Sequence, residues 1–268
     1  MFPLPTKTLP PDAESLRAAL EESIRRVVRP ESPIVTVEDA SYPQLAAIRL
    51  SLDGASAGER PPPRPPLPVS PVEPGLRVKN LEISGRPIIV QRAKVELTCS
   101  AYDVQLDQGR DRDGNVLLLL QEATNGHLEV AIALSDLEAL LLAGAQTEAA
   151  KQGVKVESVR IELQGSSERA LEVIVHVSAK KLFLNAALRI SGSVAIDAQL
   201  NAHLSGLGCD GEGTLGTLAC GFIAPHLQRF NDREFSLLAL PLGEVKLRDI
   251  RIATGRELRV TAEFGRPA

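Results

Sequence analysis

Alternation of apolar and polar residues is most sustained between Leu188 and Leu204. The even positions are aliphatic or glycine, while the odd positions are polar except for Ala195. A period of two predicts a β-strand with one apolar face. At about 3.3 Å per residue, a single strand of this length would extend roughly 55 Å, whereas ordinary strands contain about 5 or 6 residues. The pattern therefore predicts one unusually long strand with an extended apolar stripe.

A second alternating segment precedes this strand with the opposite parity. Its apolar residues, from Leu171 to Val177, have odd numbers, and from Leu182 onward they have even numbers. A β-bulge near Lys180 and Lys181 would keep one face buried through a bent strand. We expect a second kink at Gly192.

Further alternating segments are separated by Gly, Asp and Asn turns. They include "GLRVKNLEISG", "PIIVQRAKVELTC", "NVLLLLQEA", "GHLEVAIAL" and "VKVESVRIELQG", and two more strands end the chain. Sequential strands with loops of turn length predict a mostly antiparallel sheet. The expected class is α+β, rich in β-structure.

An amphipathic helix is predicted over residues 12–29, with Asp12 as its N-cap and Pro30 ending it. Its apolar face carries Leu16, Leu20 and Ile24. Its arginines suit anionic lipid. Glutamates one turn earlier favour ordinary surface ion pairs instead.

A second helix is predicted over residues 135–153. Ser135 and Glu138 have the spacing of a capping box, and Gly153 supplies a C-terminal stop. Leu137, Leu140 and Leu141 are on its apolar side. A short helical segment is also expected around Phe222, Leu227 and Phe230.

Eight prolines lie between Pro61 and Pro74, and they favour polyproline II structure. The spacing of Arg60, Pro63 and Pro66 suits an aromatic-lined partner, although a stiff linker has the same composition. We expect a flexible N-terminus over 1–11, a helix and strand packing on the main domain over 12–58, a proline-rich linker or insertion over 59–75, and a β-rich domain over 76–268.

Composition narrows the function classes. Hydrophobic residues make up 44% of the 268 residues, aromatic residues only 3%, and there is no Trp, so the core is aliphatic. The net charge is −4 and both signs are interspersed, so the sequence shows no basic patch that would bind nucleic acid. No signal peptide and no apolar stretch of about 18 residues is evident. The expected location is cytoplasmic or peripheral to a membrane.

Three groups of residues carry candidate chemistry. His203, Cys209, Cys220 and His226 are of zinc-ligand type, but their spacing does not match the usual short knuckles. In an oxidising compartment the two cysteines can instead form a disulfide. The motif "GEGTLG" (211–216) fits a dinucleotide fingerprint, but the alternating strand before it does not, so we interpret it as a tight turn.

Two carboxylate pairs, Asp210 with Glu212 and Asp111 with Asp113, lie in glycine-rich turns. These carboxylates could bind a cation weakly. The simpler interpretation is that they are solvent-exposed turn residues. No nucleophilic or acid–base arrangement is evident. We therefore expect a protein that is not an enzyme and uses no cofactor or metal.

The runs "LSDLEALL", "LRISGSVAIDAQLNAHLSGLGCDGEGTLG" and "LLALPLGEVKLRDIRIATGRELRVTAEFG" resemble the LmeA-like phospholipid-binding family of bacterial proteins. That family is similar to the tubular lipid-binding (TULIP) superfamily. The resemblance covers roughly residues 126 to 266. It implies a long, strongly curved antiparallel sheet wrapped around a helix, with an apolar groove for acyl chains and no catalytic residues. The chain departs from exported members by its proline tract and its lack of a signal peptide.

The apolar stripe and the resemblance predict binding of a phospholipid or similar amphiphile in an elongated groove, with transient contact to a membrane surface. The alternative is a closed core that serves as an interaction module, with residues 60–74 or the outer sheet face binding a protein partner. The predicted groove residues are Leu137, Leu140, Leu141, Leu188, Ile190, Val194, Ile196, Leu200 and Leu204.

Overall fold

The computed structural model describes residues 2–30, 34–57, 66–151, 153–181, 184–239 and 245–266. Over these residues the chain is a mixed α+β protein in which strands predominate, as the sequence predicts. Contacts divide it into two compact units. Unit 1 comprises 1–131, 240–249 and 261–268, and unit 2 comprises 132–239 and 250–260. The domain boundary predicted between residues 75 and 76 falls inside unit 1.

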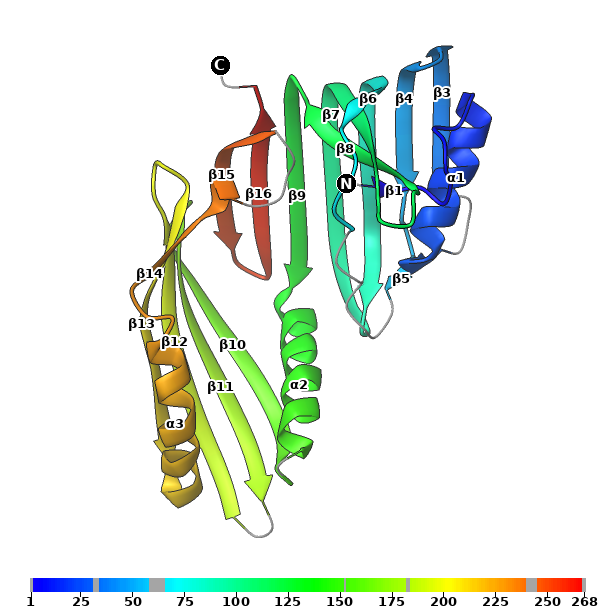
Figure 1. The fold of residues 1–268 in the computed structure, drawn as a ribbon. Helices are drawn as coiled ribbons and strands as arrows, with labels where there is room; N and C mark the ends of the chain where they lie inside the picture. The colour runs from blue at the N-terminus through cyan, green and yellow to red at the C-terminus, as the bar shows by residue number, and fades with distance from the viewer. Residues whose placement is uncertain are drawn as a thin grey trace. The chain divides into compact units, whose positions relative to one another are not determined.

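Unit 1 is built on one large sheet and one helix (Figure 1). Its elements are β1 (Phe2–Pro3), α1 (Ala13–Arg25), β2 (Val28–Arg29), β3 (Val35–Ser41), β4 (Gln44–Ser51), β5 (Ser56–Ala57), β6 (Glu73–Val90), β7 (Ala93–Arg110) and β8 (Val116–Glu122). β9 (Asn125–Ala133), β15 (Lys246–Thr254) and β16 (Glu257–Gly265) belong partly to each unit.

The main strand order of this sheet is β15-β16-β9-β7-β6-β4-β3. β6 and β7 are long antiparallel neighbours. β4 and β5 pair with β6 in parallel, so the sheet is not purely antiparallel.

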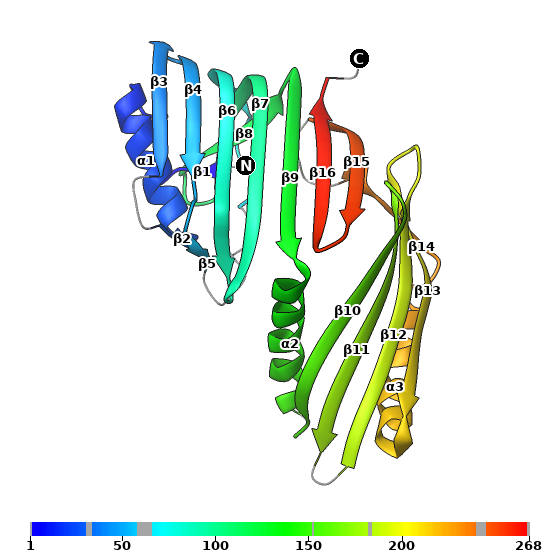
Figure 2. The ribbon, with the colours of Figure 1, turned by 180° about the vertical axis from the view of Figure 1, so that it is seen from behind.

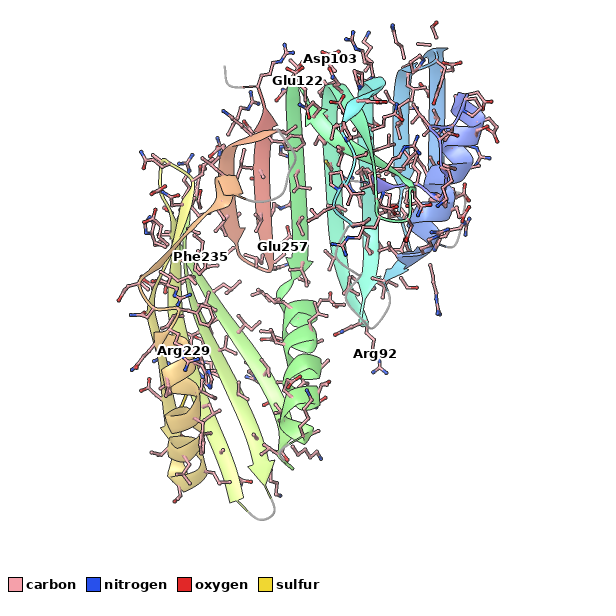
Figure 3. The ribbon with its side chains drawn as sticks, in the orientation of Figure 1. Arg92, Asp103, Glu122, Arg229, Phe235 and Glu257 are labelled. Carbon is pink, nitrogen blue, oxygen red and sulfur yellow. A yellow bond between two sulfur atoms is a disulfide. The ribbon has the colours of Figure 1, made fainter. Side chains whose placement is uncertain are left out.

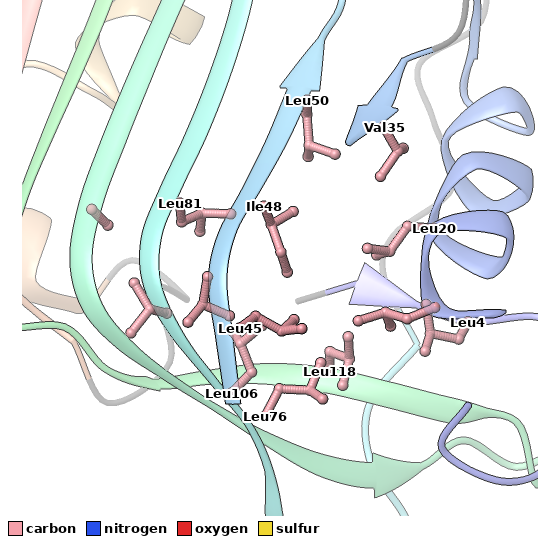
Figure 4. Packing of buried hydrophobic residues seen from close by; sticks show 14 of the residues in the cluster. Leu4, Leu20, Val35, Leu45, Ile48, Leu50, Leu76, Leu81, Leu106 and Leu118 are labelled. Atoms are coloured by element: carbon pink, nitrogen blue, oxygen red, sulfur yellow. The ribbon is translucent and has the colours of Figure 1, made fainter. Parts of the chain in front are cut away.

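The core of unit 1 is closed and aliphatic, and Figure 4 shows its packing. Leu16 and Leu20 of α1 pack with Ile48 of β4 and Leu76 of β6, and each of the four is almost fully buried. This confirms the predicted apolar face of the helix. Burial of each such side chain contributes about 1.5–3 kcal/mol.

The predicted N-cap of α1 is confirmed, because Asp12 accepts a hydrogen bond of 2.7 Å from the Ser15 amide. The predicted end at Arg29 is wrong, since the helix ends at Arg25 and Val28–Arg29 pair with β5. Glu21–Arg25 and Glu22–Arg26 form ion pairs with N–O distances of 2.6 Å. These pairs support the surface interpretation of the arginines.

The proline tract is only partly within the described residues. Residues 58–65, with Arg60 and Pro63, lie outside them. Residues 240–243 ("LPLG"), within the third run of the family resemblance, also lie outside them. In the remainder of the proline tract, Val69 donates a backbone hydrogen bond of 2.8 Å to Arg110 at the end of β7, and Ser70 Oγ accepts one of 2.9 Å from Arg110. The second half of the predicted linker is therefore attached to the sheet of unit 1.

Unit 2 contains a five-stranded sheet in which every neighbouring pair is antiparallel and the order follows the sequence. α3 covers β12 and β13, in front of them in Figure 1 and behind them in Figure 2. α2 packs against β10. The elements are α2 (Leu134–Ala150), β10 (Lys155–Ser167), β11 (Ala170–Lys181), β12 (Leu184–Ile196), β13 (Asn201–Glu212), α3 (Gly213–Gln228), β14 (Arg233–Ser236) and the short 3-10 helix η1 (Leu237–Ala239).

The single long strand predicted from Leu188 to Leu204 is wrong. β12 ends at Ile196, and a turn containing Leu200 at φ +60° leads into β13. Ile196 pairs with Ala202 and Val194 with Leu204, so even-numbered residues of both strands lie on one face of the sheet between the turn and the register shift at Ser191. The alternation therefore continues unchanged through the hairpin, as it would along one strand.

The bulge predicted near Lys180 is also wrong. β11 ends there and β12 begins three residues later, so the parity changes between two strands of a hairpin. Leu171 pairs with Val194, which brings odd and even positions onto the same face. The irregularity expected at Gly192 is confirmed by a register shift between Ser191 and Ser193.

α2 begins at Leu134 without the predicted capping box. Its N-cap residue is Ala133, and no side chain caps the helix. Glu138 instead accepts a hydrogen bond of 2.9 Å from the amide of Ile161 on β10. The predicted stop is confirmed, because Gly153 has φ +67° just beyond the helix. Among the described residues, no helix is long and apolar enough to cross a bilayer.

Candidate functional site

An apolar cavity of about 670 Å³ lies within unit 2. Strands β10, β11 and β12 form its floor, and α2 and α3 form its walls. We call it the groove. Its polar lining residues are Glu148, Lys180 and His226. The others are Ala145, Ala149, Val154, Val156, Val177, Ala179, Ala186, Leu188, Ile190, Leu215, Leu218, Ala219, Phe222 and Ile223.

The floor follows from the strand register. Val177 pairs with Leu188, and Ala179 pairs with Ala186. Directly opposed residues in an antiparallel pair point to the same face, so these side chains form a continuous apolar surface. Since alanines make up part of it, the surface leaves space above the backbone.

The α2 wall is formed by Ala145 and Ala149, one helical turn apart. They pack near Val156 and Ala179, which are buried. No residue of α2 is fully buried, although most of its side chains are apolar, and Leu142, Ala145 and Ala149 are half-buried against the sheet. An apolar helix normally buries one face fully, so the incomplete burial beside the groove is unusual.

The α3 wall is fixed to the sheet by a disulfide. Cys209 of β13 bonds to Cys220 of α3, with their Cα atoms 5.4 Å apart. Backbone contact is also close, because a Cβ on Gly211 would lie 2.1 Å from the carbonyl oxygen of Gly216. Gly216 and Cys220 are the buried residues of α3. The helix therefore presents Leu215, Ala219 and Ile223 to the groove.

The disulfide and the strand pairing exclude a zinc site at the cysteines and a dinucleotide-binding motif at the glycines. Since both thiols are in the disulfide, the set His203, Cys209, Cys220 and His226 does not form a zinc site. β13 pairs antiparallel with both its neighbours, whereas a dinucleotide-binding unit uses parallel strands. The second half of "GEGTLG" is the first turn of α3.

The predicted groove residues are divided by the structure. Leu188 and Ile190 line the groove. Val194 and Leu204 oppose each other farther along the sheet, and Ile196 and Leu200 are buried beside the hairpin turn. None of these four lines the cavity.

Leu137, Leu140 and Leu141 lie in the first half of α2, whereas the second half of that helix lines the groove. The contribution of α3 to the groove was not predicted from the sequence. The signal for it is that residues 213–228 contain no Asp, Glu, Lys or Arg.

Three polar residues form a cluster beside the turn between β12 and β13. The groove lies at the opposite end of the sheet, beside the hairpin of β11 and β12. The potential metal-ligating atoms of Asp197, His203 and Glu234 all lie within 4.8 Å of one another. Asp197 Oδ1 accepts hydrogen bonds from the amides of Gln199 (2.9 Å) and Asn201 (2.8 Å), and its Oδ2 lies 3.1 Å from His203 Nε2. Because these oxygens close the turn, we assign Asp197 a structural role.

The hydrogen bonds from Asn201 and His203 lower the pKa of Asp197 to about 2. A carboxyl whose pKa falls on folding stabilises the fold above its unfolded pKa, about 3.9, and this contribution is lost as the pH falls toward about 2. We predict that Asp197→Asn lowers the melting temperature at neutral pH. The difference in melting temperature between this variant and the native protein should shrink as the pH falls from about 4 to about 2. Thermal melts across this range test this, and an unchanged difference would contradict it.

Unit 1 contains a smaller cavity of about 360 Å³, whose lining includes the charged residues Glu122, Lys246 and Arg266 together with Ala123 and Val245. Arg266 forms an ion pair with Glu122, and its hydrogen bond lowers the pKa of that carboxyl. Figure 3 shows Glu122 among the side chains of this unit. Its charged lining does not suit an acyl chain.

Comparison with protein-family models, curated proteins and solved structures finds no match to this chain.

Proposed function

We propose that unit 2 binds an acyl chain of a phospholipid or similar amphiphile in the groove, without catalysing a reaction on it. The observation that carries this proposal is an apolar helix with no fully buried residue, α2, beside an apolar cavity of about 670 Å³. Pockets for small molecules typically measure about 300–1,000 Å³ and are mainly apolar.

The expected driving force is hydrophobic burial. About 0.8 kcal/mol is gained for each buried methylene, so ten methylenes contribute on the order of 8 kcal/mol. Loss of ligand freedom and ordering of side chains offset part of this gain. The charged residues Glu148 and Lys180, near the ends of α2 and β11, suit the polar part of the ligand.

We also propose that unit 2 is the part of the chain to which the LmeA-like and TULIP-like resemblance applies. Support comes from its antiparallel sheet, with a helix at β10, a helix over β12 and β13, and the groove they line. The open cavity argues against the alternative of a closed core in this unit. The protein-partner alternative would use the described part of residues 60–74, where Leu67, Val69 and Val72 are exposed.

The Cys209–Cys220 disulfide leads us to propose an oxidising compartment for the protein. Disulfides persist outside the cytosol and are rare within it. This proposal replaces the cytoplasmic location expected from the sequence.

A single tryptophan tests occupancy of the groove, since the native chain contains none. Phe222 lines the groove, and Phe222→Trp places one reporter there. Addition of a lysophospholipid below its micelle concentration should shift the emission to the blue and saturate at one equivalent, because the indole passes from water to an apolar contact.

Phe235→Trp provides the matched control. Phe235 lies in β14 of the same unit, is partly exposed and does not line the groove (Figure 3). Its emission should not change over the same titration. Equal shifts at both positions would indicate nonspecific adsorption, and no shift at position 222 would refute the proposed function.

A further inference from the structure

The outward face of α3 is an apolar stripe without charge. Its exposed positions, one turn apart along the helix, include Thr214, Leu218, Gly221, Phe222 and Pro225. Leu218 is 56% exposed and Phe222 is 78% exposed. Phe222 has the highest exposure of any large hydrophobic side chain in the described residues.

The exposed face of α1 is very different. α1 carries Glu14, Arg17, Glu21, Glu22 and Arg25 over 13 residues, and they form ion pairs with one another or with Arg26. α3 has 16 residues and no Asp, Glu, Lys or Arg. Such a face is poorly matched to water but well matched to the interface of a bilayer.

The stripe is continuous with the groove, because Leu218 and Phe222 are exposed and also line the cavity. This continuity suits an amphiphile that leaves a bilayer, since its acyl chain could pass from lipid to groove without crossing water.

Charged groups flank the stripe but do not interrupt it. Glu212 precedes α3, and Arg229 follows it (Figure 3). Beyond Arg229 are Asp232, Arg233 and Glu234, so both signs are present. Contact with a bilayer would therefore depend on apolar burial more than on the charge of the lipid.

From these observations we infer that the α3 stripe docks unit 2 on a lipid bilayer, with Leu218 and Phe222 entering the interface beside the mouth of the groove. This inference rests on the proposed function, because docking gives the groove access to its ligand. Binding should be nearly independent of salt up to about 1 M, where the Debye length is about 3 Å.

Gly221 permits a test that leaves the groove unaltered. It lies on the stripe, does not line the cavity, and a Cβ there would meet no atom within 4 Å. Gly221→Glu places a carboxylate between Leu218 and Phe222. We expect the fraction of protein that floats with phosphatidylcholine vesicles to fall at least roughly tenfold, since a charge is disfavoured in the apolar part of the interface. Gly221→Gln should lose less than about threefold, because it adds no charge.

Gly144→Glu, on α2, is the matched control. Gly144 is exposed on α2 and has equally open space around its Cβ position. This variant should float as well as the native protein, and all variants should take up monomeric lysophospholipid normally.

Undiminished flotation of Gly221→Glu would overturn the inference. So would uptake of monomeric lysophospholipid by a native protein that does not float, although the proposed function would then stand. Failure of both uptake and flotation would refute both. A native dimer that Gly221→Glu dissociates would show that a second copy covers the stripe, and would also overturn the inference.

Discussion

Replacing Ala186 with phenylalanine should reduce amphiphile binding by at least about a hundredfold. Ala186 lies on the floor of the groove, opposite Ala179. A benzyl group there would occupy space needed by an acyl chain, and about 2.7 kcal/mol of lost binding corresponds to a hundredfold change. Since the space is open in the native protein, the fold should keep its stability. Titration of the Phe222→Trp reporter with lysophospholipid measures the effect.

The neighbouring residue supplies the control. Ala187 pairs with Ser178, is exposed, and points to the opposite face of the sheet because side chains alternate along a strand. Ala187→Phe should bind amphiphile as the native protein does. Equal losses in the two variants, or no loss in either, would contradict the assignment of the floor.

Loss of the disulfide is expected to have the largest effect on stability. Cys209 and Cys220 are separated by 11 residues, and closing a loop of this length contributes about 3 kcal/mol in the chain-entropy model. Cys209→Ala with Cys220→Ala should lower the free energy of unfolding by about this amount. It should also weaken amphiphile binding, since α3 would no longer be fixed to the sheet as a wall.

Urea denaturation of the double variant measures the first effect, and the reporter titration measures the second. Cys99→Ala is the control, because Cys99 is a free, partly buried thiol of β7. A reducing agent should destabilise the native protein and Cys99→Ala alike, and should leave the double variant unchanged. If reduction has no effect on the native protein, the disulfide does not support the α3 wall.

Local sequence patterns predicted several elements, although the capping box expected at Ser135 and Glu138 does not form. Apolar spacing and Asp12 identified α1, and Gly153 identified the end of α2, because caps and stops are formed by adjacent residues. The alternation around Leu188 and Ile190 identified part of the groove floor. A period of two is sufficient to determine which side chains share a face.

The strand boundaries were not predictable in the same way. A hairpin whose register pairs Ile196 with Ala202 preserves the parity of the sequence, so the pattern could not distinguish two strands from one. Opposite parity at Lys180 then suggested a bulge where the chain reverses direction. Pairing register is a property of two strands together and is not contained in either one alone.

The groove walls depend on tertiary packing. Whether the first or second half of α2 faces the floor is decided by contacts with β10, such as those of Ala145 and Ala149 near Val156. α3 was expected only as a short helix, and the disulfide that fixes it to the sheet was one of two alternatives for its cysteines. The division into two units also depends on residues 240–249 and 261–268 joining the N-terminal part.

Native mass spectrometry of protein purified without detergent, followed by organic extraction, measures whether unit 2 holds an amphiphile. We expect a bound amphiphile at one equivalent, which Ala186→Phe loses and Ala187→Phe retains. A mass equal to that of the polypeptide alone, unchanged after incubation with phospholipid vesicles, would refute amphiphile binding in the groove.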